Sequence, residues 1–372
     1  MSRSYKDYKD YKDSPVARIK VIGVGGAGGN SINQMIDSGI NDRHIEILVA
    51  NTDIQDLLKS KAKTKIQLGE RITKGLGAGA NPEIGKLSAE EDKDKIKAVL
   101  EGTDLLFITA GMGGGTGTGA APVIAKVAKD LGILTVGIVT KPFSFEGQKR
   151  NKNSGTGLKD LADNVDTLVV VPNDKLFELP NKNITLINAF EEANNILKIG
   201  ITGVADLITT QGFINLDFAD VRTIMANSGL AMLGFGYAEG EGRAKKATEQ
   251  ALSSPLLERP IHGSKRILLN VTGGKDLGLK EANEIAMMIT EAAGESTTEV
   301  IFGTVMDEKL ENGIKITVIA TDFSDNINVN NKAEKEQLFV QRESEEERHS
   351  IATEEYENSL DIPALIRRSK QR

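Results

Sequence analysis

Gly111-Met112-Gly113-Gly114-Gly115-Thr116-Gly117-Thr118-Gly119 is the stretch of this 372-residue chain that decides the fold. It lies between an apolar run at residues 105–110 and a helix-like segment at 120–130. Glycine loses more conformational freedom on folding than any other residue, so a stretch this rich in glycine suits neither a helix nor a strand. A strand, a glycine loop and a helix N-terminus, in that order, direct backbone N–H groups at a phosphate. The stretch therefore predicts a phosphate-binding loop, with a flexible linker as the alternative.

Two more glycine clusters follow the same pattern. Residues 23–28 (GVGGAG) match GxGxxG after the first apolar run, and residues 75–82 (GLGAGANP) precede another helix-like segment. The carboxyl ends of parallel strands meet at one rim of a sheet, where ligands bind in doubly wound folds. We therefore expect the three clusters to line one site, and a triphosphate is the ligand that best uses so many N–H donors. No GxxxxGK[ST] motif is present, which excludes the P-loop class of nucleotide hydrolases.

A GxGxxG motif followed by an acidic residue is also the fingerprint of dinucleotide-binding enzymes. Asp53, at the end of the next expected strand, is a plausible ribose-binding acid. A Rossmann-type, NAD-dependent oxidoreductase is therefore the alternative function. Against it stands the second glycine loop at 111–119, because a single dinucleotide fingerprint does not require one.

The arrangement of apolar runs predicts the fold class. Val- and Ile-rich runs alternate with helical patterns from residue 16 to 172, which favours an α/β domain with a doubly wound, parallel sheet. The expected strands are residues 17–23, 45–51, 105–110, 134–140 and 167–171, and the expected helices are 31–38, 82–100, 122–130 and 155–164. A long central helix is expected at 184–210. A smaller C-terminal α/β domain follows, with strands at 231–238, 266–272, 299–305 and 314–320.

The chain accordingly divides into six parts. The expected boundaries are 1–14 for a disordered arm, 15–182 for the nucleotide-binding domain, 183–210 for the central helix, 211–323 for the second domain, 324–358 for a linker and 359–372 for a C-terminal peptide. The linker is rich in acidic residues and poor in apolar ones, a composition typical of disorder. An apolar segment returns at 360–366 and predicts a peptide that binds in a partner's groove, with a tail of no function as the alternative.

Composition excludes several classes of function. The absence of cysteine rules out disulfides and thiolate metal sites, and the histidines are scattered singly, so no zinc site or Ser-His-Asp triad is indicated. A net charge of −7 gives no support to nucleic-acid binding. No signal peptide and no membrane-spanning run is recognised, which predicts a soluble cytoplasmic protein. The triple Tyr-Lys-Asp repeat at 5–13 is either native or similar to an added tag, and it contributes nothing to the predicted fold.

Two pairs of charged residues are candidates for chemistry. Glu146 and Arg150 have the spacing of an ordinary i,i+4 ion pair and could equally hold a ribose and a phosphate, so the spacing leaves both open. Asp217 and Asp220 lie at a loop-to-helix junction. There they form either a helix cap or a pair of acids that positions and polarises a water, with Asn215 orienting it.

The second acidic pair is far in sequence from the glycine rim. In a monomer it would face away from the nucleotide. It could serve a neighbour's nucleotide if subunits stacked head to tail, a contact that builds filaments rather than closed rings.

These motifs resemble those of the tubulin/FtsZ family of GTPases. Residues 113–119 (GGGTGTG) are similar to the family signature in its bacterial form, and Asn215-x-Asp217-x-x-Asp220 is similar to the catalytic synergy loop. The resemblance runs from about residue 18 to 322, and the tail from Asp361 to Arg368 is similar to the C-terminal peptide of the bacterial cell-division members. It implies a GTP-dependent, head-to-tail polymer that forms the cytokinetic ring at midcell, on the inner face of the membrane, and recruits division proteins.

The resemblance also assigns nucleotide-binding roles. The residues implied to hold GTP or GDP are Gly25, Gly26, Ala27, Gly28, Gly29, Asn30, Gly113, Gly114, Gly115, Thr116, Gly117, Thr118 and Gly119. Glu146 and Arg150 would contact ribose and phosphate. Phe190 would stack on the guanine, and Asn194 would hydrogen-bond it, where many relatives have Asp. Ala27 replaces a more common glycine, which matters only if φ must be positive there.

Catalysis and partners are implied in the same way. Asp217 and Asp220, with Asn215, would complete hydrolysis in the adjoining subunit. Mg²⁺ would be held mainly by the phosphates, with no protein metal site. The tail would bind membrane-tethering proteins such as FtsA, ZipA or SepF-like proteins, without inserting into the membrane itself.

Overall fold

A computed structural model describes residues 17–40, 45–178, 185–210, 212–294 and 297–323. The expected arm, acidic linker and C-terminal peptide lie outside these residues. The described strands form one sheet in the order β3-β2-β1-β4-β5-β6-β7-β10-β8-β9. Their bounds are β1 Ile19–Val24, β2 Ile45–Asn51, β3 Thr64–Gln67, β4 Leu105–Gly111, β5 Leu134–Lys141, β6 Thr167–Pro172, β7 Gly229–Glu239, β8 Ser264–Gly273, β9 Glu299–Met306 and β10 Gly313–Phe323.

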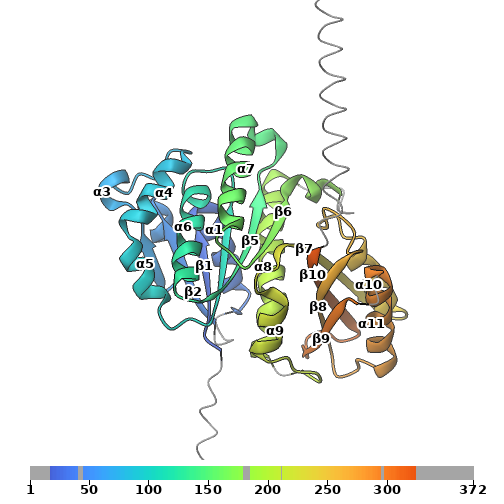
Figure 1. The fold of residues 1–372 in the computed structure, drawn as a ribbon. Coiled ribbons are helices and arrows are strands. Elements are labelled where there is room, and N and C mark those ends of the chain that lie inside the picture. The colour runs from blue at the N-terminus through green and yellow to red at the C-terminus, as the bar shows by residue number, and fades with distance from the viewer. Residues whose placement is uncertain (1–16, 41–44, 179–184, 211, 295–296, 324–372) are drawn as a thin grey trace, which may run out of the picture. The chain divides into compact units, whose positions relative to one another are not determined.

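Helices surround this sheet (Figure 1). They are α1 Gly25–Asp37, α2 Ile54–Lys59, α3 Glu70–Thr73, α4 Pro82–Glu91, α5 Lys93–Leu100, α6 Thr116–Asp130, α7 Gln148–Ala162, α8 Leu186–Thr209, α9 Phe218–Met225, α10 Arg243–Leu252 and α11 Leu279–Ala293, with short 3-10 turns η4 Ser144–Glu146 and η5 Asn173–Glu178. Strands β3, β2, β1, β4, β5 and β6 are neighbours in this order, and each pairs in parallel with the next. This confirms the predicted doubly wound α/β domain.

Both faces of the parallel sheet are buried. Neighbouring residues of β1 point to opposite faces: Val21 packs in one core with α1 and α8, and Ile22 packs in another with α5 and α6. A strand covered on both faces has no polar side, which explains why β1, β4 and β5 are mostly apolar along their length. Burial of each such side chain stabilises the fold by roughly 1.5–3 kcal/mol.

The central helix α8 connects the two halves of the molecule. Its 24 residues extend over about 36 Å at 1.5 Å per residue, and its buried residues Ile201 and Val204 pack in one core that includes side chains of both halves of the sheet. Asn270 of β8 donates a hydrogen bond from Nδ2 to the Gly203 carbonyl of α8 at 2.8 Å. Figure 1 shows strands β7 to β10 beside α8, with α10 and α11 on their outer side. The helix is thus a packed element of both halves.

The two halves also share strand pairing. The first three residues of β7, Gly229 to Ala231, pair in parallel with Thr167 to Val169 of β6. From Met232 onward β7 pairs antiparallel with β10. The strands of the first and second domains therefore belong to one continuous sheet.

The helix boundaries correct the sequence-based expectation in four places, one of which is α7, which begins at Gln148 instead of residue 155. Helices α1 and α6 begin at Gly25 and Thr116, inside clusters expected to be loops, and 82–100 is two helices instead of one. The break falls at Asp92, whose side chain accepts a hydrogen bond from Gly69 N at 2.7 Å and so holds its residue outside the helical region. The short β3, α2 and α3 were not predicted, because they contain too few residues to show a period.

Candidate functional site

The three glycine clusters meet around one cavity of about 480 Å³. Its walls include Gly25 to Ala27 from the first cluster, Leu76 to Ala80 from the second and Gly114 to Gly117 from the third. The predicted convergence of the clusters is therefore confirmed. In Figure 1, β5 points toward the top of the view, so this rim lies at the upper ends of the parallel strands.

Two helices begin at the cavity without a side-chain cap. Val24 and Gly115 are the N-cap residues of α1 and α6, and neither offers a polar side chain to the free N–H groups of the first turn. The N-terminus of a helix carries a partial positive charge and unpaired donors, which together attract anions. Gly25 has φ +73°, and a β-carbon there would lie 2.8 Å from Gly117 N, so this glycine lets the two helix starts come together.

Several residues expected on the cavity wall lie elsewhere. Gly28, Gly113, Thr118 and Gly119 do not line this cavity, and the expectation that they touch the nucleotide stays a prediction. Gly28 and Gly119 lie within α1 and α6 and face the sheet and α4, whereas Gly113 precedes α6 and lies against Arg150 and Pro142. Thr118 accepts a hydrogen bond through Oγ1 from Gly113 N at 2.8 Å and so fixes the loop from behind.

Gly29 and Asn30 line a smaller recess of about 40 Å³. Gly25 and Gly26 belong to the walls of both the recess and the main cavity. Ala27 does line the main cavity, and it lies within helix α1. No positive φ is needed there, so the replacement of glycine costs the fold nothing.

Aromatic and amide side chains gather at the α8 end of the cavity. Phe190 and Asn194 line it, and the Phe190 ring packs edge-on against buried Phe143 with centroids 5.3 Å apart. Asn173 lines the same space and was missed by sequence reasoning. It is only 5% exposed, and its Oδ1 has no hydrogen-bond partner among the described residues. Its position directly after β6, at the rim where ligands bind, was the signal that could have identified it.

Glu146 and Arg150 form the i,i+4 ion pair that was one of the alternatives, and their contact with a ribose and a phosphate stays a prediction. Both line the cavity. Glu146 also accepts a hydrogen bond from Phe143 N at 2.9 Å, which ties the pair to the aromatic group.

Two further acids, Asp53 and Asp56, line the cavity. Asp53 caps α2 by accepting from Gln55 N at 2.8 Å, and Asp56 accepts from Asn51 Nδ2 at 3.3 Å. The described part of the chain contains no group of three or more acidic, histidine or cysteine side chains that could hold a metal ion by itself.

Asp217 and Asp220 form a reciprocal helix cap. Asp217 accepts from Asp220 N at 2.9 Å, and Asp220 accepts from Asp217 N at 3.1 Å, at the start of α9. Asn215 accepts from Gly212 N at 2.7 Å in the preceding loop. None of the three lines the cavity. The structure therefore contains the cap that was one of the alternatives. Each carboxylate uses one oxygen atom in the cap and keeps its other oxygen atom available.

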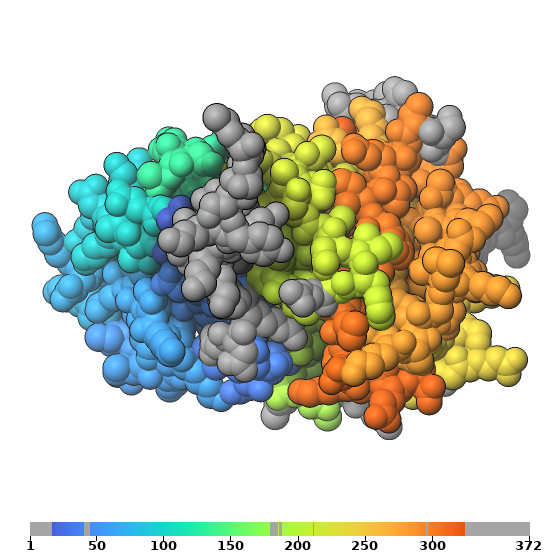
Figure 2. Space-filling view, turned by 90° about the horizontal axis from the view of Figure 1, so that it is seen from below, coloured from blue at the N-terminus to red at the C-terminus, as the bar shows by residue number. Residues whose placement is uncertain are grey.

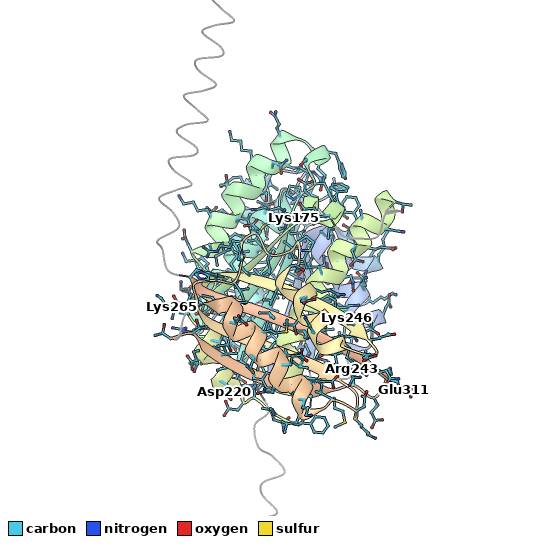
Figure 3. All side chains as sticks on the ribbon, turned by 90° about the vertical axis from the view of Figure 1, so that its right-hand side faces the viewer. Lys175, Asp220, Arg243, Lys246, Lys265 and Glu311 are labelled. Carbon is cyan, nitrogen blue, oxygen red and sulfur yellow. The ribbon has the colours of Figure 1, made fainter. Side chains whose placement is uncertain are left out.

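The acids and the cavity lie at opposite ends of the molecule. Figure 3 places Asp220 in the lower part of the view and Lys175, which belongs to η5, in the upper part. Seen from below in Figure 2, the yellow-green segment that contains the end of α8 and α9 reaches the surface between the two domains. One chain therefore does not bring the acids to its own cavity.

Comparison with known proteins identifies the family. A model described as the GTPase domain of the Tubulin/FtsZ family matches residues 18–181, and one for the FtsZ family C-terminal domain matches 229–324. An empty FtsZ dimer from M. jannaschii is 44% identical, with a TM-score of 0.80, covering 86% of this chain and 92% of that chain. This chain belongs to the tubulin/FtsZ family. It is therefore a GTPase, and the alternative of an NAD-dependent oxidoreductase is wrong.

Two solved structures of lower identity share the fold. CetZ1 from Haloferax volcanii, in a GDP-bound monomer, is 22% identical with a TM-score of 0.73, and the match covers 88% of this chain and 99% of that chain. CetZ2 from the same organism, in a GTPγS-bound protofilament, is 21% identical with a TM-score of 0.71 and the same coverage. Within the described residues, no helix combines the length and the apolar character that crossing a membrane requires.

Proposed function

We propose that the cavity binds GTP, with the phosphates at the starts of α1 and α6 and the guanine beside Phe190 and Asn194. The observation that carries this proposal is the meeting of two uncapped helix N-termini on one cavity. A triphosphate supplies the negative charge that both helix ends favour. Phe190 is 41% exposed and offers a stacking surface for the base.

Hydrolysis requires a group that positions water, and each acid on the cavity wall already has a partner in its own chain, Asp56 accepting from Asn51. Glu146 is paired with Arg150, and Asp53 caps α2. We infer that Asp217 and Asp220 of a neighbouring subunit, oriented by their mutual cap and assisted by Asn215, position and polarise the attacking water. Their place at the end of the molecule opposite the cavity supports this arrangement, because head-to-tail stacking brings opposite ends together.

A magnesium ion fits the same site. Mg²⁺ prefers oxygen ligands and is usually held by one or two carboxylates together with substrate phosphates. Asp53 and Asp56, on the cavity wall near the start of α1, are the residues that would assist. When bound, the ion would neutralise charge on the phosphates.

The wider role follows from the polymer. We propose that the chain assembles head to tail into filaments, as self-association of the M. jannaschii dimer supports. The filaments would form a division ring on the inner face of the membrane. The tail from Asp361 to Arg368 would bind a membrane-tethering protein of the FtsA, ZipA or SepF type, an inference that rests on the sequence alone.

The test separates nucleotide binding from shared catalysis. GTP should displace a fluorescent GDP analogue from the full chain, and NADH should not. Turnover per subunit should rise steeply with protein concentration, because the complete site needs two subunits. Absence of GTP binding would refute the assignment of the cavity, and turnover that is independent of concentration would refute the shared active site.

A further inference from the structure

One buried threonine of the second domain binds the loop that precedes the acids. Thr304 of β9 is 3% exposed, and its Oγ1 accepts a hydrogen bond from Ile214 N at 2.7 Å. Thr304 N donates in return to Ile214 O at 3.0 Å. The direction of the first bond is certain, because a backbone N–H can only donate. Both backbone polar groups of Ile214 are therefore bound to one residue of β9.

The same strand contacts the loop on either side of Ile214. Strand β9 is at the edge of the sheet, which leaves one side of its backbone open to the loop. A β-carbon at Gly212 would overlap the Thr304 carbonyl oxygen, so the loop approaches β9 as closely as glycine allows. On the other side, a β-carbon at Gly303 would lie 3.0 Å from Leu216 Cδ1. The loop is thus held against two neighbouring residues of β9.

This loop leads directly into the candidate catalytic groups. Asn215 follows Ile214 in the sequence, and Asp217 is three residues after Ile214, at the start of α9. Asn215 and Asp217 are exposed. Because no core packing surrounds exposed side chains, the backbone of the loop determines where they lie. The contacts with Thr304 therefore set the position of the groups that follow.

We propose that Thr304 is a positioning residue for GTP hydrolysis, and that its hydroxyl holds the loop so that Asn215 and Asp217 meet the attacking water in the neighbouring subunit. The proposal rests on the shared active site proposed above. Thr304 does not line the cavity, so it acts through the loop of its own chain on the neighbour's GTP. Loss of the hydroxyl leaves Ile214 N without its acceptor. A displacement of about 1 Å at a catalytic group can reduce the rate by about 100-fold.

The first test replaces the hydroxyl of Thr304 with a methyl group. In Thr304→Val, GTP turnover per assembled subunit should fall by about tenfold or more. Displacement of a fluorescent GDP analogue should show unchanged GTP affinity, because the cavity is untouched. GTP-dependent pelleting measures the assembled fraction, so slow turnover is distinguished from poor assembly. Thr304→Ser keeps the accepting oxygen and should restore most of the turnover, whereas equally slow turnover in both variants would contradict the role of the hydroxyl.

Thr248→Val is the matched control. Thr248 is also buried in the second domain, and its hydroxyl donates within its own helix, to Ala244 O at 2.7 Å. This variant should lose some stability in urea unfolding and keep its turnover per assembled subunit. An equal fall of turnover in Thr248→Val and Thr304→Val would reduce Thr304 to a structural role and overturn the proposal.

A double-mutant cycle tests whether Thr304 acts through the acids. In a chain that carries both Asp217→Ala and Asp220→Ala, the addition of Thr304→Val should cause little further loss of turnover, because the positioned groups are already absent. A further loss as large as in the unmodified chain would overturn the proposal. Normal turnover in the chain without the two acids would instead refute the shared active site. Loss of turnover there, with normal turnover in Thr304→Val, would refute the role of Thr304 alone.

Gly212→Ala disturbs the same contact from the loop side, even if Thr304→Val does not fold. Its methyl group would push the loop away from the Thr304 carbonyl oxygen. Turnover per assembled subunit should fall while GTP affinity persists. Normal turnover in Gly212→Ala would show that the contact with β9 does not position the catalytic groups.

Discussion

Gly119 of α6 lies directly against Pro82 of α4. A β-carbon at position 119 would overlap the Pro82 carbonyl oxygen and lie 2.6 Å from Lys86 N. The helices α4 and α6 each follow a glycine cluster of the cavity wall. The contact at Gly119 therefore sets the distance between two of the three clusters.

Gly119→Ala should weaken both the fold and nucleotide binding. The added methyl group forces α4 and α6 apart, at a cost of about 1–3 kcal/mol for overpacking. Urea unfolding and displacement of a fluorescent GDP analogue measure the two effects. Gly155→Ala in α7 is the control: a β-carbon there meets nothing within 4 Å, and alanine should stabilise the helix by about 0.5–1 kcal/mol. Equal stability of the two variants would show that the helices can separate without cost.

Asp217→Asn should separate capping from catalysis. Asparagine caps helices about as well as aspartate, so unfolding free energy should change by less than about 0.5 kcal/mol. The loss of the carboxylate should nevertheless reduce GTP turnover by about 100-fold or more, the usual contribution of a group that activates water. GTP binding should persist, since Asp217 does not line the cavity of its own chain.

Asp217→Ala extends this comparison, because it removes the cap and the carboxylate together. It should lose both turnover and about 1 kcal/mol of stability. Full GTPase activity in the asparagine variant would leave Asp217 with the capping role alone.

Glu281 should contribute stability that depends on pH. It binds buried Arg243 through Oε1 at 2.7 Å and Oε2 at 2.9 Å, and these hydrogen bonds hold the pKa of the Glu281 carboxyl below its usual value. Arg243 is labelled in Figure 3. A lowered pKa means that the contribution is complete above the usual value of about 4.3 and is lost as the pH falls through the lower folded-state pKa.

Glu281→Gln should therefore unfold more easily than the unmodified chain by about 2 kcal/mol at pH 7, and the gap should narrow below pH 4. Glu284→Gln, on the same helix at an exposed position, is the control and should show little difference at any pH. Denaturant titrations from pH 7 to 3 make the comparison. A gap for Glu281→Gln that stays constant across this range would contradict the role of its charge.

Deletion of residues 360–372 should leave assembly intact. The described domains do not include this segment, and all of the proposed GTP site lies within residues 17–323. GTP-dependent pelleting should therefore be unchanged, while recruitment to vesicles that carry a tethering protein should be lost. Loss of GTP-dependent pelleting would instead show that residues 360–372 contribute to filament assembly.

The glycine clusters made the fold and the cavity predictable, because they signal close approach of the backbone in a local pattern. The positions of every strand except β3 were predictable for the same reason, because each is an apolar run with its own flanking signals. The starts of α1 and α6 were not, since packing against the sheet overrides the low helix propensity of glycine. A local pattern thus located the site without fixing which of its residues face the ligand.

Contacts between distant segments were beyond the sequence. Ser31 and Asn194 are 163 positions apart in the sequence, and neither segment contains a pattern that predicts their contact. Asn173 carries no motif beyond its place after a strand. Asp217 and Asp220 were ambiguous for a physical reason, because the same carboxylates that cap α9 can act on a neighbour.

The separation of the acids from the cavity makes the two ends of a filament chemically different. In the proposed stack, every internal nucleotide is covered by a neighbour's Asp217 and Asp220. At one terminus the last subunit carries acids with no nucleotide beneath them. At the other, the last subunit holds a nucleotide with no acids above it, and that GTP survives until another subunit arrives. Each added subunit therefore starts GTP hydrolysis on the subunit that it covers. The age of each nucleotide site along the filament follows the order in which the subunits joined.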